Sequence, residues 1–146
     1  MWVPAVGCHR CGNHAEYDAL ASNTAISTGR QFISRYDSGS VVGKIFQDSI
    51  SFGGMVVHGV EMGAVNYQEE RIRGFKADGL VGLAFPAIST TQMSSSSEYP
   101  TILQLLRKQH GPGVAGMFSV FLTSSPNQQG SELIFGGYNL DLVRRQ

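Results

Sequence analysis

Glycine is the residue that most constrains this chain, because it makes up 18 of the 146 residues. Glycine adopts backbone conformations that other residues avoid and is therefore frequent in tight turns. The pair Gly53-Gly54 separates two apolar segments, residues 41–52 and 55–57, and predicts a two-residue hairpin turn. Short apolar segments joined by many turns are typical of β-sheet proteins. We therefore expect a mainly β fold.

Other segments support this expectation and add one helix. Apolar residues at 31–34, 117–123 and 132–137 predict three further strands. One helix is predicted near residues 99–111, with Pro100 in its first turn and Gly111 at its end. The Ser- and Thr-rich residues 88–98 before it predict a surface loop.

Two of the apolar segments contain a residue that does not suit a buried strand. In residues 41–52, Asp48 interrupts a face formed by Phe46, Ile50 and Phe52. Residues 78–86 read as a buried strand with Gly82 at its centre. Glycine weakens a strand interior, so it marks either a bulge or a place where a second segment crosses closely.

Size and charge limit what the chain can do. Its length suits a single domain with a sizeable core. Its 11 basic and 11 acidic residues give zero net charge, so nucleic acid is not an expected partner. No apolar run is long enough for a transmembrane helix. The first ten residues lack the charge and apolar pattern of a signal peptide.

The two cysteines, Cys8 and Cys11, form a C-x-x-C pair with His9 and His14 nearby. A disulfide closing a small loop is the main interpretation and would indicate an oxidising compartment. A zinc site would need a second ligand pair, and a redox pair would need a strand and a helix around it. No metal or other cofactor is expected.

The order of several motifs resembles the amino-terminal lobe of a pepsin-like aspartic protease, close to the cathepsin D and E type. The matching segments are WVP (2–4), the cysteine loop (8–11), GRQFISRYDSGSVVGKIFQDSISFGG (29–54), DGLVGLAFP (78–86), PTILQLLRKQ (100–109), MFSVFLTS (117–124) and GSELIFGGYN (130–139). The resemblance implies a mainly β, incomplete double-ψ β-barrel-type lobe with one or two short helices. It identifies residues 1–146 as a partial lobe, lacking its first strands and the carboxy-terminal lobe.

The resemblance also bears on Asp37-Ser38-Gly39, which has the form of a catalytic Asp-Ser-Gly. In the family, the Tyr-Gly-Ser/Thr-Gly-Ser stretch forms the flap, a hairpin that closes over the substrate, and YDSGS resembles it with Asp37 replacing glycine. The family's first catalytic motif lies just before Trp-Val-Pro, so here it would precede Met1. The second belongs to the carboxy-terminal lobe. We therefore assign no catalytic residue in this chain.

The implied site residues fall into two groups. The flap tyrosine is Tyr36, with its hydroxyl directed to the indole of Trp2. The flap and substrate-binding residues are Trp2, Tyr36, Asp37, Ser38, Gly39, Ser40, Ala77 and Leu80. The structural cleft element comprises Asp78, Gly79, Val81 and Gly82.

The resemblance implies an aspartic endopeptidase acting on peptide or protein substrates, with this chain inactive without the carboxy-terminal lobe. It also implies a secreted, vacuolar or lysosomal location for the full-length family member. Two alternatives remain. A retropepsin-like homodimer would use Asp37 from each chain as its catalytic carboxylate. A non-catalytic module would use the cleft walls to bind peptides.

Overall fold

In a computed structural model, the chain is mainly β, as the sequence predicts. The structure describes residues 1–85, 99–114, 116–124 and 130–143. The expected loop at 88–98 lies outside these residues. No helix within them is long and apolar enough to cross a membrane.

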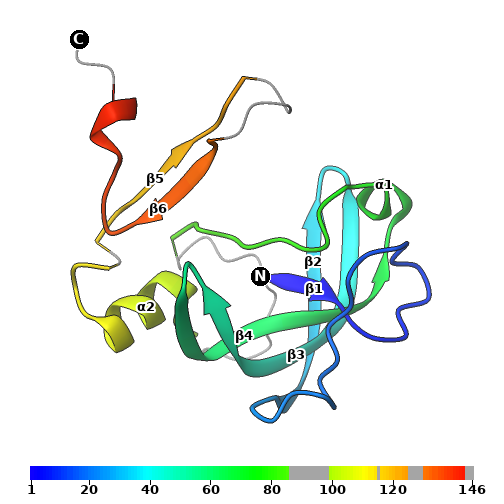
Figure 1. The fold of residues 1–146 in the computed structure, drawn as a ribbon. Helices are drawn as coiled ribbons and strands as arrows, with labels where there is room; N and C mark the ends of the chain where they lie inside the picture. Colours follow the sequence, from blue (N-terminus) through cyan, green and yellow to red (C-terminus); the bar gives the residue numbers. More distant parts are fainter. Residues whose placement is uncertain (86–98, 115, 125–129, 144–146) are drawn as a thin grey trace.

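The larger sheet has four strands in the order β1-β4-β3-β2 (Figure 1). Strands β2 (Ile26–Tyr36), β3 (Gly39–Phe52) and β4 (Met55–Gln68) form an antiparallel meander. Strand β1 (Trp2–Pro4) pairs with β4 in the parallel direction, with Trp2 opposite Gly63. The first residues of the chain thereby form an edge strand along the middle of β4.

The turn between β3 and β4 confirms the predicted hairpin. Phe52 pairs with Met55, and Gly53 and Gly54 have φ values of 57° and 79°. Positive φ at both central residues gives the backbone twist that suits the flanking strands, and glycine adopts it without strain.

The predicted helix is α2 (Ile102–His110), which packs near β4. It begins after Thr101, whose side chain accepts a hydrogen bond from the Gln104 amide, while the Gln104 side chain accepts one from the Thr101 amide. Pro100 therefore precedes the cap and does not lie in the first turn. Gly111 follows the last helical residue, as predicted.

The remaining elements are short. Helix α1 (Glu70–Arg73) follows β4, and a 3-10 helix, η2 (Leu140–Leu142), lies near the end of the described chain. The two predicted strands form the ribbon of β5 (Phe118–Phe121) and β6 (Glu132–Phe135). This ribbon lies beyond α2, away from the main sheet (Figure 1).

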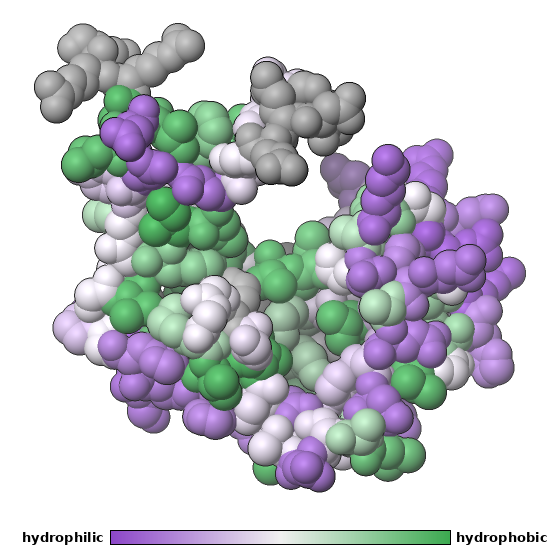
Figure 2. All heavy atoms as spheres, in the orientation of Figure 1, coloured by the Kyte–Doolittle hydropathy of each residue, from purple (hydrophilic) through white to green (hydrophobic). Residues whose placement is uncertain are grey.

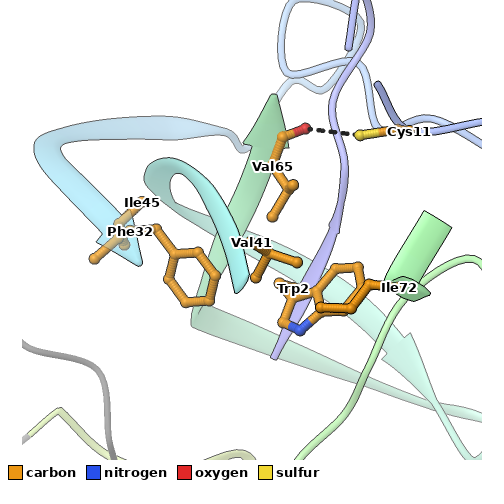
Figure 3. Packing of buried hydrophobic residues seen from close by; sticks show 7 residues of the cluster. All are labelled: Trp2, Cys11, Phe32, Val41, Ile45, Val65 and Ile72. Carbon is orange, nitrogen blue, oxygen red and sulfur yellow. Dashed lines mark hydrogen bonds between the residues drawn. The ribbon is translucent and has the colours of Figure 1, made fainter. Parts of the chain in front are cut away.

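The core consists of two clusters. The first contains Trp2, Cys11, Phe32, Val41, Ile45, Val65 and Ile72, which meet between the sheet, the cysteine loop and α1 (Figure 3). The second joins Val57 and Val60 of β4 to Ile102, Leu105 and Leu106 of α2. Apolar side chains also line a hollow on the face shown in Figure 2. Val120 of β5 and Leu122, which follows this strand, are 55% and 74% exposed.

Candidate functional site

The β2–β3 hairpin carries the predicted flap sequence at its tip. Tyr36 and Gly39 form the last pair of the two strands, and Asp37 and Ser38 form the turn between them. Asp37 is exposed to solvent. The hairpin extends past the sheet, because the pairing of β3 with β4 ends at Val41 and Gln68.

The hydroxyl of Tyr36 contacts the Trp2 indole, as the family resemblance implies. The indole Nε1 of Trp2 donates a hydrogen bond to the Tyr36 hydroxyl oxygen at 2.9 Å. Trp2 is 5% exposed and belongs to the first core cluster, whereas Tyr36 is 38% exposed. Trp2 is therefore fixed in the core, whereas Tyr36, the last residue of β2, presents part of its aromatic ring to solvent.

Leu80 is brought to the same place by backbone hydrogen bonds. The Trp2 amide donates to the Leu80 carbonyl at 2.9 Å, and the Leu80 amide donates to the Trp2 carbonyl at 3.0 Å. Ala77 lies in an exposed bend before this bridge. The structure thus groups Trp2, Tyr36 and Leu80.

The expected buried strand at 78–86 is wrong. Within residues 78–85, the part of this segment that the structure describes, only the single bridge between Trp2 and Leu80 forms, and Leu80 and Val81 are 45% and 42% exposed. A close backbone approach that requires glycine is seen in this segment at Gly79. A methyl group at Gly79 would overlap the Trp2 carbonyl oxygen, whereas one at Gly82 would meet no atom within 4 Å.

Asp78 ties this segment to the cysteine loop. Its Oδ1 accepts a hydrogen bond from the Ala15 amide at 3.1 Å and lies 3.3 Å from His14 Nδ1. The other ring nitrogen of His14 lies 3.1 Å from the Arg73 carbonyl oxygen. Asp78 therefore has a structural contact that accounts for its position, beside the role that the sequence resemblance implies.

Cys8 and Cys11 are joined by a disulfide, which confirms the main interpretation of the C-x-x-C pair. Cys11 is 1% exposed, and its sulfur lies 3.9 Å from the Val65 carbonyl oxygen (Figure 3). A disulfide sulfur carries no hydrogen, so this is a packing contact. Within the described residues, no group of three or more histidine, cysteine or acidic side chains is arranged to hold a metal ion.

Asp48, which interrupts an apolar face in the sequence, is the centre of a buried hydrogen-bond network. Asp48 is 4% exposed and accepts hydrogen bonds from the Tyr17, Ser22 and Thr24 hydroxyls and from the Ser49 amide. Burial alone would raise the pKa of Asp48, but these hydrogen bonds outweigh it and hold the pKa below its usual range. Burial and the hydrogen bond to Asp48 both raise the pKa of Tyr17, which keeps its hydroxyl a donor.

A cavity of about 480 Å³ lies beside this network. Its lining includes Val3, Tyr17, Asp48, Asp78 and Val81, but none of residues 36–40. Val3 lines the cavity and Trp2 does not, which agrees with the alternation of side chains across a strand. We therefore separate this cavity from the group formed by Trp2, Tyr36 and Leu80.

These features describe a mainly β protein in which a tyrosine-bearing hairpin is joined through Trp2 to the half-exposed Leu80. Comparison with known proteins specifies the family. The family model for eukaryotic aspartyl proteases matches residues 1–144. The chain therefore belongs to the eukaryotic aspartyl protease family.

Individual relatives agree with this assignment. Cathepsin D of Gallus gallus is 32% identical over 143 residues, which cover 94% of this chain and 34% of that protein. Cathepsin E of Cavia porcellus is 30% identical over 142 residues, covering 95% of this chain and 34% of the relative. Gastricsin of Homo sapiens is 28% identical over 149 residues, covering all of this chain and 37% of the relative. The chain thus spans about a third of the length of these proteins.

Proposed function

We propose that this chain forms the flap and part of the substrate-binding cleft of an aspartic endopeptidase, an enzyme that hydrolyses peptide bonds in proteins. The observation that carries the proposal is the hydrogen bond from Trp2 Nε1 to the Tyr36 hydroxyl, 2.9 Å long, at the base of the YDSGS hairpin. This bond holds the half-exposed Tyr36 ring to Trp2, whose backbone is bridged to Leu80, and the ring can lie along a bound peptide. Peptide or protein substrates are the partners that this arrangement suits.

The residues of this chain would bind and orient the substrate. The proposed chemistry requires two carboxylates that share one proton, one activating a water molecule and the other protonating the leaving group. Asp37 is a poor candidate for such a pair, because it lies in an exposed turn where water would stabilise its charge. We assign both carboxylates to a longer protein in which residues 1–146 form part of the amino-terminal lobe and a carboxy-terminal lobe is the partner.

Asp37 would instead influence substrate choice. A carboxylate in the turn of the flap repels acidic side chains of a peptide beneath it and attracts basic ones, an effect that salt would weaken. The Cys8–Cys11 disulfide suits an oxidising compartment. We therefore propose a secreted, vacuolar or lysosomal location for the full-length protein.

The first test uses the 146-residue chain itself. We expect no cleavage of an unfolded protein between about pH 3 and pH 6, either by the wild type or by Asp37→Asn. Peptide binding, followed by the fluorescence of Trp2, should weaken about fivefold in Tyr36→Phe, the size expected for one lost hydrogen bond. Tyr138→Phe removes a hydroxyl from another exposed tyrosine and serves as the control. Cleavage by the wild type that Asp37→Asn abolishes would refute the proposal and favour the retropepsin-like homodimer.

A chimera separates the proposal from the binding-module alternative. Residues 1–146 would replace the matching segment of Gallus gallus cathepsin D, which supplies the remaining two thirds of the protein. A folded chimera that cleaves an unfolded protein would support the protease role. A folded chimera that binds peptides without cleaving them would favour a non-catalytic module.

A further inference from the structure

The tip of the β2–β3 hairpin lies outside the four-stranded sheet and needs its own support. Pairing of β2 with β3 continues to Tyr36 and Gly39, but β4 pairs with β3 only as far as Val41. A two-stranded ribbon by itself is at best marginally stable in water. On the β2 side, the Tyr36 hydroxyl is held by Trp2. The β3 side of the tip is held by a different residue.

That residue is Glu69, which follows the last residue of β4. The Ser40 hydroxyl donates a hydrogen bond to Glu69 Oε1 at 2.6 Å, and the Glu69 amide donates one to the Ser40 carbonyl at 3.0 Å. The Glu69 side chain also lies against Gly39. A Cβ added at Gly39 would come within 2.7 Å of Glu69 Oε2 and 2.9 Å of Glu69 Cβ. Glu69 thus contacts both residues that begin β3.

Glu69 is itself fixed to the core through α1. Its carbonyl oxygen accepts hydrogen bonds from the Ile72 and Arg73 amides, each at 3.0 Å. Ile72 is 1% exposed and belongs to the same cluster as Trp2. The two contacts that hold the hairpin tip, one on each strand, are therefore anchored in the same apolar cluster.

We propose that Glu69 is a positioning residue that latches the β3 side of the hairpin tip through Ser40 and Gly39. Movement of the tip away from Glu69 breaks the two Ser40 hydrogen bonds. The latch therefore sets the resting position of Tyr36 relative to Trp2. The effect on a bound peptide rests on the proposed flap function, whereas the latch itself does not.

Amide hydrogen exchange tests the latch without any ligand. In Ser40→Ala and in Glu69→Ala, the protection factor of the residue 69 amide should fall about fivefold. The hydrogen bond lost in these variants opposes the local opening of the hairpin tip that exposes this amide to solvent. Ser40→Thr keeps the hydroxyl and should retain the wild-type value. Glu70→Ala is the matched control, because the neighbouring Glu70 side chain is 89% exposed and pairs with Arg73.

A loss of protection in both test variants, absent from Glu70→Ala and Ser40→Thr, supports the latch. Protection equal to the wild type in either Ser40→Ala or Glu69→Ala overturns it. Thermal unfolding of the same proteins separates a local effect from a general loss of stability, which would lower protection throughout the sheet as well.

Peptide dissociation, followed by Trp2 fluorescence, tests the link to function. Dissociation should be about fivefold faster in Ser40→Ala and Glu69→Ala than in Glu70→Ala. Reduced protection with an unchanged dissociation rate would overturn the positioning role. If the wild-type chain binds no peptide, the proposed flap function fails, and hydrogen exchange alone still decides whether Glu69 latches the hairpin.

Discussion

Replacing Asp48 by asparagine should destabilise the protein at neutral pH and remove a defined part of its acid sensitivity. The carboxylate is buried and accepts hydrogen bonds from three hydroxyls and one backbone amide. Asparagine has nearly the same shape and keeps one oxygen acceptor. In the wild type, the Tyr17 hydroxyl donates to Asp48 Oδ2 at 2.7 Å. Asparagine removes the charge and places an NH₂ group, itself a donor, opposite this hydroxyl.

The size of the effect follows from these contacts. A hydrogen bond to a charged group contributes about 1.5–3 kcal/mol, compared with about 0.5–1.5 kcal/mol between neutral groups. Asparagine weakens four hydrogen bonds but no longer requires a charge to be buried, which offsets part of the loss. We therefore expect a loss of about 2 kcal/mol in the free energy of unfolding at pH 7. Asp48→Ala leaves all four donors without this acceptor and should cost about 3–5 kcal/mol.

The pH dependence has a definite sign. The pKa of Asp48 is lower in the folded chain than in the unfolded chain, so ionised Asp48 stabilises the fold above its unfolded pKa of about 3.9. This stabilisation is lost as the pH falls through the lower, folded pKa. The difference in stability between wild type and Asp48→Asn should therefore be constant from about pH 5 to pH 7 and shrink below about pH 4.

Urea unfolding followed by Trp2 fluorescence measures this difference at each pH. Asp37→Asn is the matched control, because it makes the same change in an exposed turn, and its stability should stay close to that of the wild type. A parallel loss of stability in Asp48→Asn and the wild type between pH 5 and pH 3 would show that the buried carboxylate contributes nothing to acid unfolding and would refute its proposed role.

Two further substitutions test the packing and the helix cap. Gly79→Ala should cost more than 2 kcal/mol in urea unfolding and lower the protection of the Trp2 amide against exchange, because the added methyl overlaps the Trp2 carbonyl oxygen. Gly82→Ala, where the methyl meets open space, should change stability by less than about 0.5 kcal/mol, and equal costs at the two sites would contradict the structure. Thr101→Ala removes the cap that accepts from the Gln104 amide and should lower stability by about 1 kcal/mol, whereas an unchanged unfolding midpoint would show that the cap is unimportant.

Local signals were sufficient where a few adjacent residues determine the structure. The Gly53-Gly54 turn is specified by two glycines that both adopt positive φ. The helix at 102–110 is specified by the glycine after it, although Pro100, expected in the first turn, lies just before the cap residue Thr101. The hydrogen bond between Trp2 and Tyr36 was expected only from the family resemblance, because nothing in the local pattern connects these two residues.

Features that depend on distant partners were missed. The close approach of Gly79 to the Trp2 carbonyl oxygen was not predicted, because its partner lies 77 residues earlier in the chain. Asp48 looked like an interruption of a strand because its hydroxyl partners come from a separate loop. Glu69 gave no signal, since a glutamate after a strand is ordinary until the hairpin is seen against it.

The parallel pairing of β1 with β4 has a consequence for synthesis. Strand β1 leaves the ribosome before β4, and Gly63, the partner of Trp2, emerges only after the whole β2–β3 hairpin. No tight turn can bring parallel strands together, so β1 remains unpaired until the meander has formed, and pairings between distant residues slow folding. During that interval the tryptophan is exposed and available to a chaperone or to a second nascent chain. Its burial marks the moment at which the newly made sheet acquires its fourth strand.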